Sequence, residues 1–241
     1  MPTTWYNGLV QQIEQIAPSV KRFFVQVPAE TPFHFQAGQF VTMDLPLGDK
    51  RLQRWRSYSI ANAPDDSGML EFCIVRNPNG EATRYLFESV KPGDTLRFKG
   101  PDGAFYLPET IEKDIVMICT GTGVAPFRSM LLDLHNSGRP HRNIHLIFGT
   151  REASGILYQD DFEQLTRTMP GFQYDVVLSR QADWDGYQGH VHQVYMADYR
   201  QARPDVDFYL CGWSSMIDEA VANLLLQLGY GRSQVHYELY G

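Results

Sequence analysis

Cysteine is scarce in this 241-residue chain, and the three that occur stand far apart. Cys73, Cys119 and Cys211 offer neither a metal-ligand spacing nor a disulfide framework. The four-cysteine pattern of a plant-type iron–sulfur domain is also missing. Of the seven histidines, His190 and His192 stand two positions apart, which is a poor metal motif. We therefore expect no metal site.

Basic residues and long apolar runs are also in short supply. The chain has 21 Lys and Arg against 28 Asp and Glu, a formal net charge of −7. Nucleic-acid binding needs a concentrated basic face, so this balance argues against it. No stretch approaches the 18 apolar residues of a membrane-spanning helix, and the first residues form neither a basic region nor an apolar run. We expect a soluble, cytoplasmic protein without a membrane partner.

The hydrophobic pattern changes character near residue 110. Before it, apolar and polar residues alternate, as at positions 41–45 and 70–74, which predicts antiparallel strands with one buried face. After it, the apolar residues form continuous runs at 115–118, 146–148, 176–178 and 208–210. Such runs, separated by helix-length segments, predict a parallel sheet in an α/β layer. We place a small β-barrel domain at residues 1–108 and an α/β domain at 109–241.

The most informative segment of the first half is residues 56–61 (RSYSIA). Arg56 can offer a fixed charge and a fork of donors to a phosphate, and Tyr58 a flat face to a ring system. Ser59 can offer a hydroxyl or an amide to a reactive ring atom. Alone, the pattern is weak, because ordinary strands often alternate Tyr with Ser.

In the second half, residues 121–126 (GTGVAP) follow the apolar run at 115–118 and open a predicted helix through Met130 and Leu134. Glycines let a backbone approach a pyrophosphate, and a helix amino terminus turns unpaired amides toward it. The turn lacks the third glycine of the dinucleotide fingerprint. A later helix is predicted between a capping box at residues 215–218 and Gly229.

In this order, the two segments resemble the ferredoxin–NADP reductase superfamily, in which the first holds a flavin and the second the pyrophosphate of a nicotinamide cofactor. Further segments resemble the family in the same order: residues 35–40 (FQAGQF), 74–76 (IVR), 80–83 (GEAT), 100–105 (GPDGAF), 209–212 (YLCG) and the terminal Glu238 and Tyr240. The resemblance implies an antiparallel Greek-key flavin barrel followed by a parallel-sheet nucleotide-binding domain.

The resemblance also implies a set of site residues. The flavin would contact Arg56, Tyr58, Ser59, Ile74, Arg76, Gly80, Thr83 and Tyr240. The nicotinamide coenzyme would contact Gly121, Thr122, Gly123, Pro126, Arg151, Ser179, Arg180, Cys211 and Gly212. Catalysis would rest on Ser59 near the flavin nitrogen, Cys211 beside the nicotinamide, Glu238, and Tyr240 as a cover on the flavin face. The alternatives are inert packing for Cys211 and a plain terminal edge strand for the last residues.

The implied function is an NAD(P)H-dependent flavoprotein oxidoreductase that holds FAD, with FMN as the less favoured flavin. Ser179 and Arg180 resemble NADPH-using relatives, whereas residues 184–186 (WDG) resemble NADH-using oxygenase reductases, so we favour NADPH narrowly. The resemblance implies a separate acceptor, either ferredoxin or flavodoxin, or alternatively an oxygenase component or free flavin. Arginines at 51, 54, 56, 76 and 84 could form a basic rim for it. A non-enzymatic flavin- or nucleotide-binding module is the alternative of another class.

Overall fold

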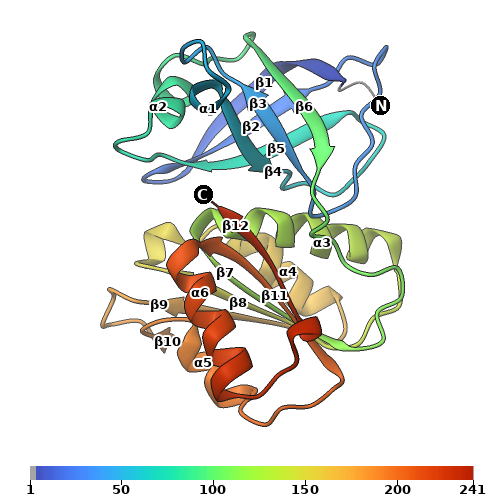
Figure 1. The fold of residues 1–241 in the computed structure, drawn as a ribbon, viewed down its shortest axis with the longest axis vertical. Helices are drawn as coiled ribbons and strands as arrows, with labels where there is room; N and C mark the ends of the chain where they lie inside the picture. The colour runs from blue at the N-terminus through green and yellow to red at the C-terminus, as the bar shows by residue number, and fades with distance from the viewer. Residues whose placement is uncertain (1–3, 241) are drawn as a thin grey trace. The chain divides into compact units, whose positions relative to one another are not determined.

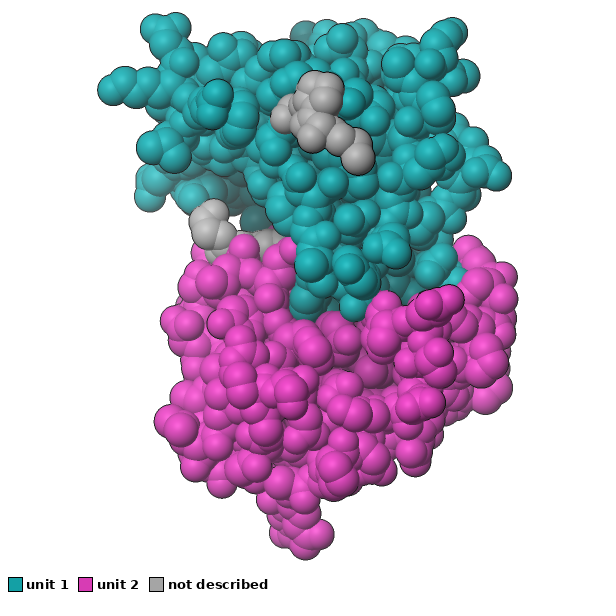
Figure 2. All heavy atoms as spheres, turned by 45° about the vertical axis from the view of Figure 1, so that its right-hand side comes forward, with its two compact units in different colours: residues 1–106, 125–133 teal, residues 107–124, 134–241 magenta. Residues whose placement is uncertain are grey.

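The computed structural model describes residues 4–240, which divide into two compact units (Figure 2). Unit 1 comprises residues 1–106 and 125–133, and unit 2 comprises residues 107–124 and 134–241. Helix α3 (Val124–Ser137) is therefore shared, because its middle residues group with unit 1. None of the helices within residues 4–240 is long and apolar enough to cross a membrane.

Unit 1 is built from antiparallel strands (Figure 1). They are β1 (Trp5–Ala17), β2 (Val20–Gln26), β3 (Phe40–Asp44), β4 (Trp55–Ser59), β5 (Met69–Val75) and β6 (Thr95–Asp102), joined by helices α1 (Arg51–Arg54) and α2 (Glu81–Glu88). The strand order is β4-β3-β6-β1-β2-β5. Beyond Ser59 the chain reaches the opposite end of this sheet, where Ile60 forms a bridge with Phe72. That bridge closes the sheet into a barrel.

The barrel core follows from the alternation seen in the sequence. Val41, Met43 and Leu45 are almost fully buried, and so are Leu70 and Phe72 on the far side of the core. Their polar neighbours on each strand point the other way because side chains alternate along a strand. The predicted antiparallel barrel is confirmed.

Unit 2 is a parallel sheet with helices on both faces (Figure 1). Its strands are β7 (Asp114–Thr120), β8 (Ile144–Thr150), β9 (Phe172–Leu178), β10 (Tyr187–Gln188), β11 (Val206–Trp213) and β12 (Val235–Tyr240). Its helical segments are α4 (Gln159–Thr168), α5 (His192–Asp198) and α6 (Ser214–Ala222), the 3-10 turns Gly121–Gly123, Ala153–Gly155 and Arg232–Gln234, and a π-helical turn at Asn223–Gln227. The strand order is β10-β9-β8-β7-β11-β12, and every pair is parallel.

Helices cover both faces of this sheet, so the middle of each central strand is apolar on both faces. Val194 of α5 and Ile217 of α6 join a buried cluster with Val177 on one face, whereas Phe162 of α4 packs on Tyr174 at the other. The four continuous apolar runs predicted from the sequence all lie in these strands, which confirms the α/β layer.

One helix boundary differs from the sequence prediction. Helix α6 begins at Ser214 with Trp213 as its N-cap, and no side chain caps it, so the capping box predicted at residues 215–218 is wrong. Strand β11 runs directly into the helix and leaves no free turn for a serine cap. The predicted stop is confirmed, because Gly229 takes a left-handed φ of 77° after the π-helical turn.

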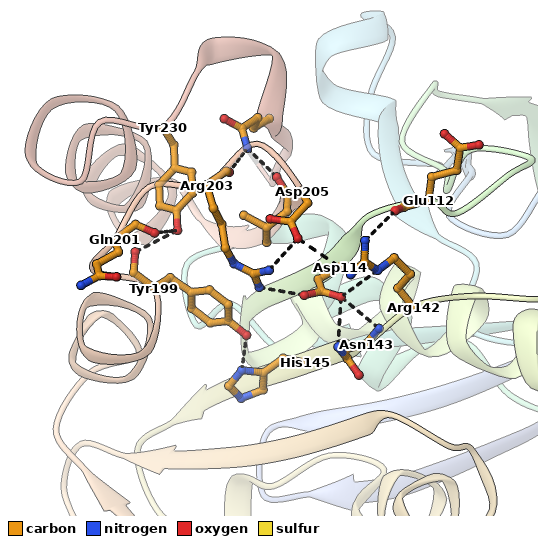
Figure 3. Close-up of polar contacts among 12 residues, drawn as sticks. Glu112, Asp114, Arg142, Asn143, His145, Tyr199, Gln201, Arg203, Asp205 and Tyr230 are labelled. Atoms are coloured by element: carbon orange, nitrogen blue, oxygen red, sulfur yellow. Dashed lines mark hydrogen bonds and ion pairs between the residues drawn. The ribbon is translucent and has the colours of Figure 1, made fainter.

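A polar network fastens the amino-terminal edge of the unit 2 sheet (Figure 3). Asp114, the first residue of β7, accepts hydrogen bonds from Nη2 of Arg203 at 2.7 Å and from both nitrogens of Asn143. Arg142 and Asp205 extend the ion pairs around it. Burial alone would raise the pKa of the Asp114 carboxyl group. The hydrogen bonds from Arg203 and Asn143 and the charge of Arg203 outweigh burial, so the pKa is lowered.

We expect Asp114→Asn to destabilise the protein at neutral pH by about 1–3 kcal/mol, because it replaces the carboxylate that binds Nη2 of Arg203 by a neutral amide. A carboxyl group whose pKa is lowered by folding stabilises the protein at pH values above its unfolded pKa of about 3.9. This stability is lost as the pH falls through the lower pKa of the folded state. Chemical unfolding at pH 7 and pH 3 should therefore show a deficit that shrinks in acid. The control is Asp205→Asn. The Asp205 side chain is 40% exposed, so its loss should lower the free energy of unfolding by less than about 1 kcal/mol. A deficit of equal size at both pH values would contradict the prediction.

Candidate functional site

In unit 1, strand β4 carries the three residues predicted to meet a flavin. Because side chains alternate, Arg56 and Tyr58 face one side of the strand and Ser59 the other. Tyr58 packs against the barrel core, and burial, opposed by the charge of Arg56, raises its pKa well above the ordinary value. The phenol therefore stays neutral at physiological pH. Ser59 is buried at the point where the strand ends.

The guanidinium of Arg56 has no acidic partner within residues 4–240. Its Nη1 donates to the carbonyl oxygens of Leu52 at 2.8 Å and Trp55 at 2.7 Å. A cation held by neutral acceptors keeps its full charge available, and a forked guanidinium suits a phosphate. The structure thus places a charge of the required sign beside the neutral ring of Tyr58.

The amino end of α2 carries the next predicted residues. Gly80 is its N-cap, and the hydroxyl of Thr83 accepts from the Asn77 amide at 3.0 Å and lies within hydrogen-bond distance of two carbonyls of the same turn. Thr83 therefore shapes the loop that leads into the helix. Ile74 is buried in β5, and Arg76 forms an ion pair with Glu88.

The arginines expected to form a basic rim are mostly paired. Arg54 binds Asp44 through two hydrogen bonds, Arg76 pairs with Glu88, and Arg84 lies 4.0 Å from Glu81. Arg51 instead lies over the ring of Trp55, which also meets Trp5 edge to face. Of these five arginines, only Arg51 and Arg56 have no acidic partner among the described residues.

In unit 2, the strand order reverses between β7 and β11. The chain runs from β7 outward to β8, β9 and β10, then returns to β11 on the other side. In open parallel sheets, ligands bind beyond the carboxyl ends of the strands at such a reversal. The turn Gly121–Gly123 follows β7 at this edge, and Cys211 and Gly212 lie at the end of β11. The structure thus brings together two motifs that are about ninety residues apart in the sequence.

At this edge, each glycine is required either by its backbone conformation or by a close neighbour. Gly121 takes a left-handed φ of 53°. A Cβ on Gly123 would lie 2.3 Å from the carbonyl oxygen of Cys211, and one on Gly212 would lie 2.5 Å from Oγ1 of Thr120. The two strand ends therefore approach each other closely, and the backbone amide of Trp213 donates a 3.3 Å hydrogen bond to Oγ1 of Thr120.

Helix α3 begins directly after this turn. Thr122 is buried, and Gly123 serves as the N-cap with no side-chain hydrogen bond. Pro126 is the third residue of the helix and so lies in its first turn, where amide groups have no partner within the helix and a missing amide hydrogen costs little.

Strand pairing also sets the carboxyl-terminal residues beside Cys211. Glu238 lies opposite Cys211, and Tyr240 opposite Trp213, in the parallel pair β11–β12. Strand β12 thus forms an edge of the sheet. The side chain of Tyr240 and the whole of Gly241 lie outside the described residues. On the other side, Cys119 faces Cys211, and burial together with that neighbour raises the pKa of Cys119 well above its ordinary value.

Two further predicted residues meet at the ends of β8 and β9. The Arg180 amide donates to the carbonyl oxygen of Arg151 at 2.8 Å, and the Ser179 amide to that of Thr150 at 3.0 Å. Arg151 and Arg180 are exposed, and neither has an acidic partner among the described residues. Two unpaired guanidinium groups on adjoining loops form a cationic edge that can bind a phosphate.

Two features escaped the sequence reasoning. Trp213 is 61% exposed at the end of β11, and its only signal was its place directly after the 209–212 segment. His145, Asp175 and Asp198 come close enough to be metal ligands. Both ring nitrogens of His145 are already engaged, at 2.8 Å with Asp175 and 2.9 Å with the hydroxyl of Tyr199, so we read the group as a structural network.

Comparison with known families assigns a domain to most of each half. Residues 7–106 match an oxidoreductase FAD-binding domain, and residues 117–222 match an oxidoreductase NAD-binding domain. These matches confirm the predicted oxidoreductase class and the predicted cofactors, FAD and NAD(P)H, without distinguishing NADH from NADPH.

Three known proteins are similar over nearly all of the chain. Ferredoxin–NADP reductase B of Sorangium cellulosum (strain So ce56) is 32% identical over 98% of this chain and 97% of its own length. The phenol hydroxylase P5 protein of Acinetobacter pittii (strain PHEA-2) is 34% identical over 91% of this chain, which spans only 61% of that protein. The crystal structure of the cytochrome P450 reductase GcoB of Amycolatopsis superposes with a TM-score of 0.88 at 28% identity, covering 99% of this chain and 70% of that one.

We expect Gly123→Ala to destabilise unit 2 by about 1–3 kcal/mol or more, because the new methyl group would meet main-chain atoms that cannot rotate away. The matched control is Gly231→Ala. Gly231 has an ordinary φ of −73°, and its nearest neighbour would lie 3.4 Å from the added Cβ. Denaturant unfolding of both variants measures the difference, and a Gly123→Ala protein as stable as the control would refute the close contact.

Proposed function

This chain belongs to the ferredoxin–NADP reductase superfamily, and on that premise we propose that it is a flavoprotein reductase, which passes a hydride from NAD(P)H to bound FAD and then single electrons to a separate carrier. We propose a ferredoxin- or flavodoxin-like protein as that carrier. The main support for this proposal is the close contact between the turn Gly121–Gly123 and Cys211 at the edge of the sheet where β7 and β11 end. The proposed functional domains are residues 1–108 for the flavin and 109–241 for the nucleotide.

In the flavin half, Arg56 is proposed to hold the pyrophosphate and Tyr58 the ring system. When bound, the flavin accepts a hydride and gives up its two electrons one at a time. Arg56 suits the binding of a phosphate because its guanidinium donates only to the neutral carbonyl oxygens of Leu52 and Trp55 among the described residues. A phosphate would give it a stronger, charge-assisted hydrogen bond. Ser59 is proposed to meet the reactive nitrogen. Thr83 and the neighbouring amides at the amino end of α2 are proposed to bind the pyrophosphate together with Arg56, and Ile74, Arg76 and Gly80 to shape the rest of the site.

In the nucleotide half, Gly121, Thr122, Gly123 and Pro126 are proposed to present the amino end of α3 to the coenzyme pyrophosphate. Cys211 and Gly212 are proposed to lie beside the nicotinamide. Strand pairing sets Glu238 opposite Cys211, which supports the proposal that Glu238 helps to orient the reacting ring. Tyr240 is proposed as the cover of the flavin face.

A second candidate is the reductase component of an oxygenase, with NADH as its donor. The similarity to the phenol hydroxylase P5 protein and to the cytochrome P450 reductase GcoB favours it. The two candidates share the flavin and nucleotide chemistry and differ in the acceptor. Arg51 and the aromatic pair Trp5 and Trp55 offer a cationic and aromatic contact for an acidic acceptor in either case.

The first experiment is a visible spectrum of the purified protein, followed by anaerobic mixing with NADPH and NADH in separate stopped-flow runs. We expect a bound flavin that bleaches rapidly with at least one donor. A flavin that stays oxidised with both donors would favour a binding module, and a protein that loses its flavin on desalting would favour a flavin reductase. A colourless protein that takes up no FAD would refute the proposal at its first step.

We expect Arg180→Ala to weaken the binding of NADPH far more than the binding of NADH, because only NADPH carries the extra phosphate. One lost charge-assisted bond of about 1.5–3 kcal/mol corresponds to a roughly 10- to 100-fold rise in the NADPH dissociation constant. The control is Arg167→Ala on the exposed end of α4. Binding titrations with both coenzymes measure the difference, and parallel losses for NADPH and NADH would end the phosphate assignment.

A further inference from the structure

The segment that follows Ser59 is the joint at which the barrel of unit 1 closes. Ile60 bridges Phe72, and the Ala61 amide donates to the carbonyl oxygen of Glu71 at 2.8 Å. The Asn62 side chain accepts from the Glu71 amide, also at 2.8 Å. These bonds engage the amides of the joint but leave the carbonyls of Ala61 and Asn62 in need of donors.

Helix α3 supplies both donors. Nη1 of Arg128 donates to the carbonyl oxygen of Ala61 at 2.9 Å, and the hydroxyl of Ser129 donates to that of Asn62 at 2.6 Å. Arg128 is 8% exposed and Ser129 fully buried, so water cannot replace these bonds. The helix residues that make them belong to unit 1.

The charge of Arg128 is balanced inside the same unit. Its Nη1 lies 3.1 Å from Oε2 of Glu71. Arg22 donates one hydrogen bond to each oxygen of the same carboxylate. Arg22 in turn pairs with Glu14, so two cations and two anions alternate from α3 across β5 and β2 to β1. Glu71 therefore keeps a cationic partner if either arginine is removed, whereas Ala61 depends on Arg128.

We propose that Arg128 and Ser129 are positioning residues for the flavin end of β4. By holding the main chain of Ala61 and Asn62, they fix the strand exit and hence the place of Ser59 two and three residues earlier. The helix that holds this joint starts directly after the turn Gly121–Gly123 in the sequence. This inference rests on the proposed function of Ser59 and adds two residues that the family motifs did not single out.

The test compares Arg128→Met with Arg22→Met in the full chain. Each variant removes one guanidinium from Glu71, but only Arg128→Met frees the Ala61 carbonyl. We expect Arg128→Met to raise the FAD dissociation constant and slow flavin reduction by NAD(P)H by about tenfold or more, with clearly smaller changes in Arg22→Met. Arg128→Lys keeps one cationic donor and should recover part of both losses.

Hydrogen exchange of the flavin-free protein gives a readout that does not depend on the proposed reaction. The Ile60 and Ala61 amides should exchange about tenfold faster in Arg128→Met than in Arg22→Met. Equal losses of FAD affinity and of exchange protection in the two variants would overturn the proposal, because the loss of one cation beside Glu71 would then account for both effects. Wild-type behaviour of Arg128→Met would overturn it as well. If the wild type binds no FAD, the proposed function fails, while the exchange comparison still decides the positioning role.

Ser129→Ala keeps the proposal testable should Arg128→Met not fold, because it removes no charge. We expect a rise of several-fold in the FAD dissociation constant and faster exchange at the joint. The matched control is Ser137→Ala on the same helix, since among the described residues the Ser137 hydroxyl bonds only to the Leu134 carbonyl and the Arg139 amide near the helix end. Identical behaviour of the two serine variants would count against the anchor.

Discussion

The close approach of two strand ends is the constraint on which the nucleotide half of this protein depends. Strands β7 and β11 end so near each other that Gly123 and Gly212 have no room for a Cβ atom. This contact sets where helix α3 can begin and keeps Cys211 beside Cys119 and Glu238. A glycine-rich turn in this fold therefore serves main-chain packing as well as phosphate approach, and the two demands select the same residue type.

The flavin half depends on a different device, a barrel closed by a short joint rather than by a long strand pair. One bridge and a few main-chain bonds join β4 to β5, and buried polar groups of α3 complete them. Buried charges are tolerated there because each has an opposite partner within hydrogen-bond distance. The same joint lies next to Ser59, so barrel closure and the proposed flavin contact share one segment.

Local pattern was a sound guide where local physics decides the outcome. Alternation at positions 41–45 and continuous apolar runs such as 115–118 predicted the strand types, because burial on one or both faces dictates them. The helix cap at residues 215–218 was wrong because β11 continues straight into α6 and overrides the local signal. The basic rim was largely lost because Arg54, Arg76 and Arg84 find acidic partners, some of them distant in the sequence.

Residue patterns along the chain were enough to predict the two-part architecture and the family, and they indicated the segments that carry the proposed site residues. Which residues are neighbours became known from the fold: Cys211 with Glu238, Arg151 with Arg180, and Ala61 with Arg128. Motifs reflect the chemistry that each short segment must support, so they can be read one at a time. Neighbourhood depends on strand order and register, which arise from the packing of segments tens of residues apart and leave no mark in any single motif.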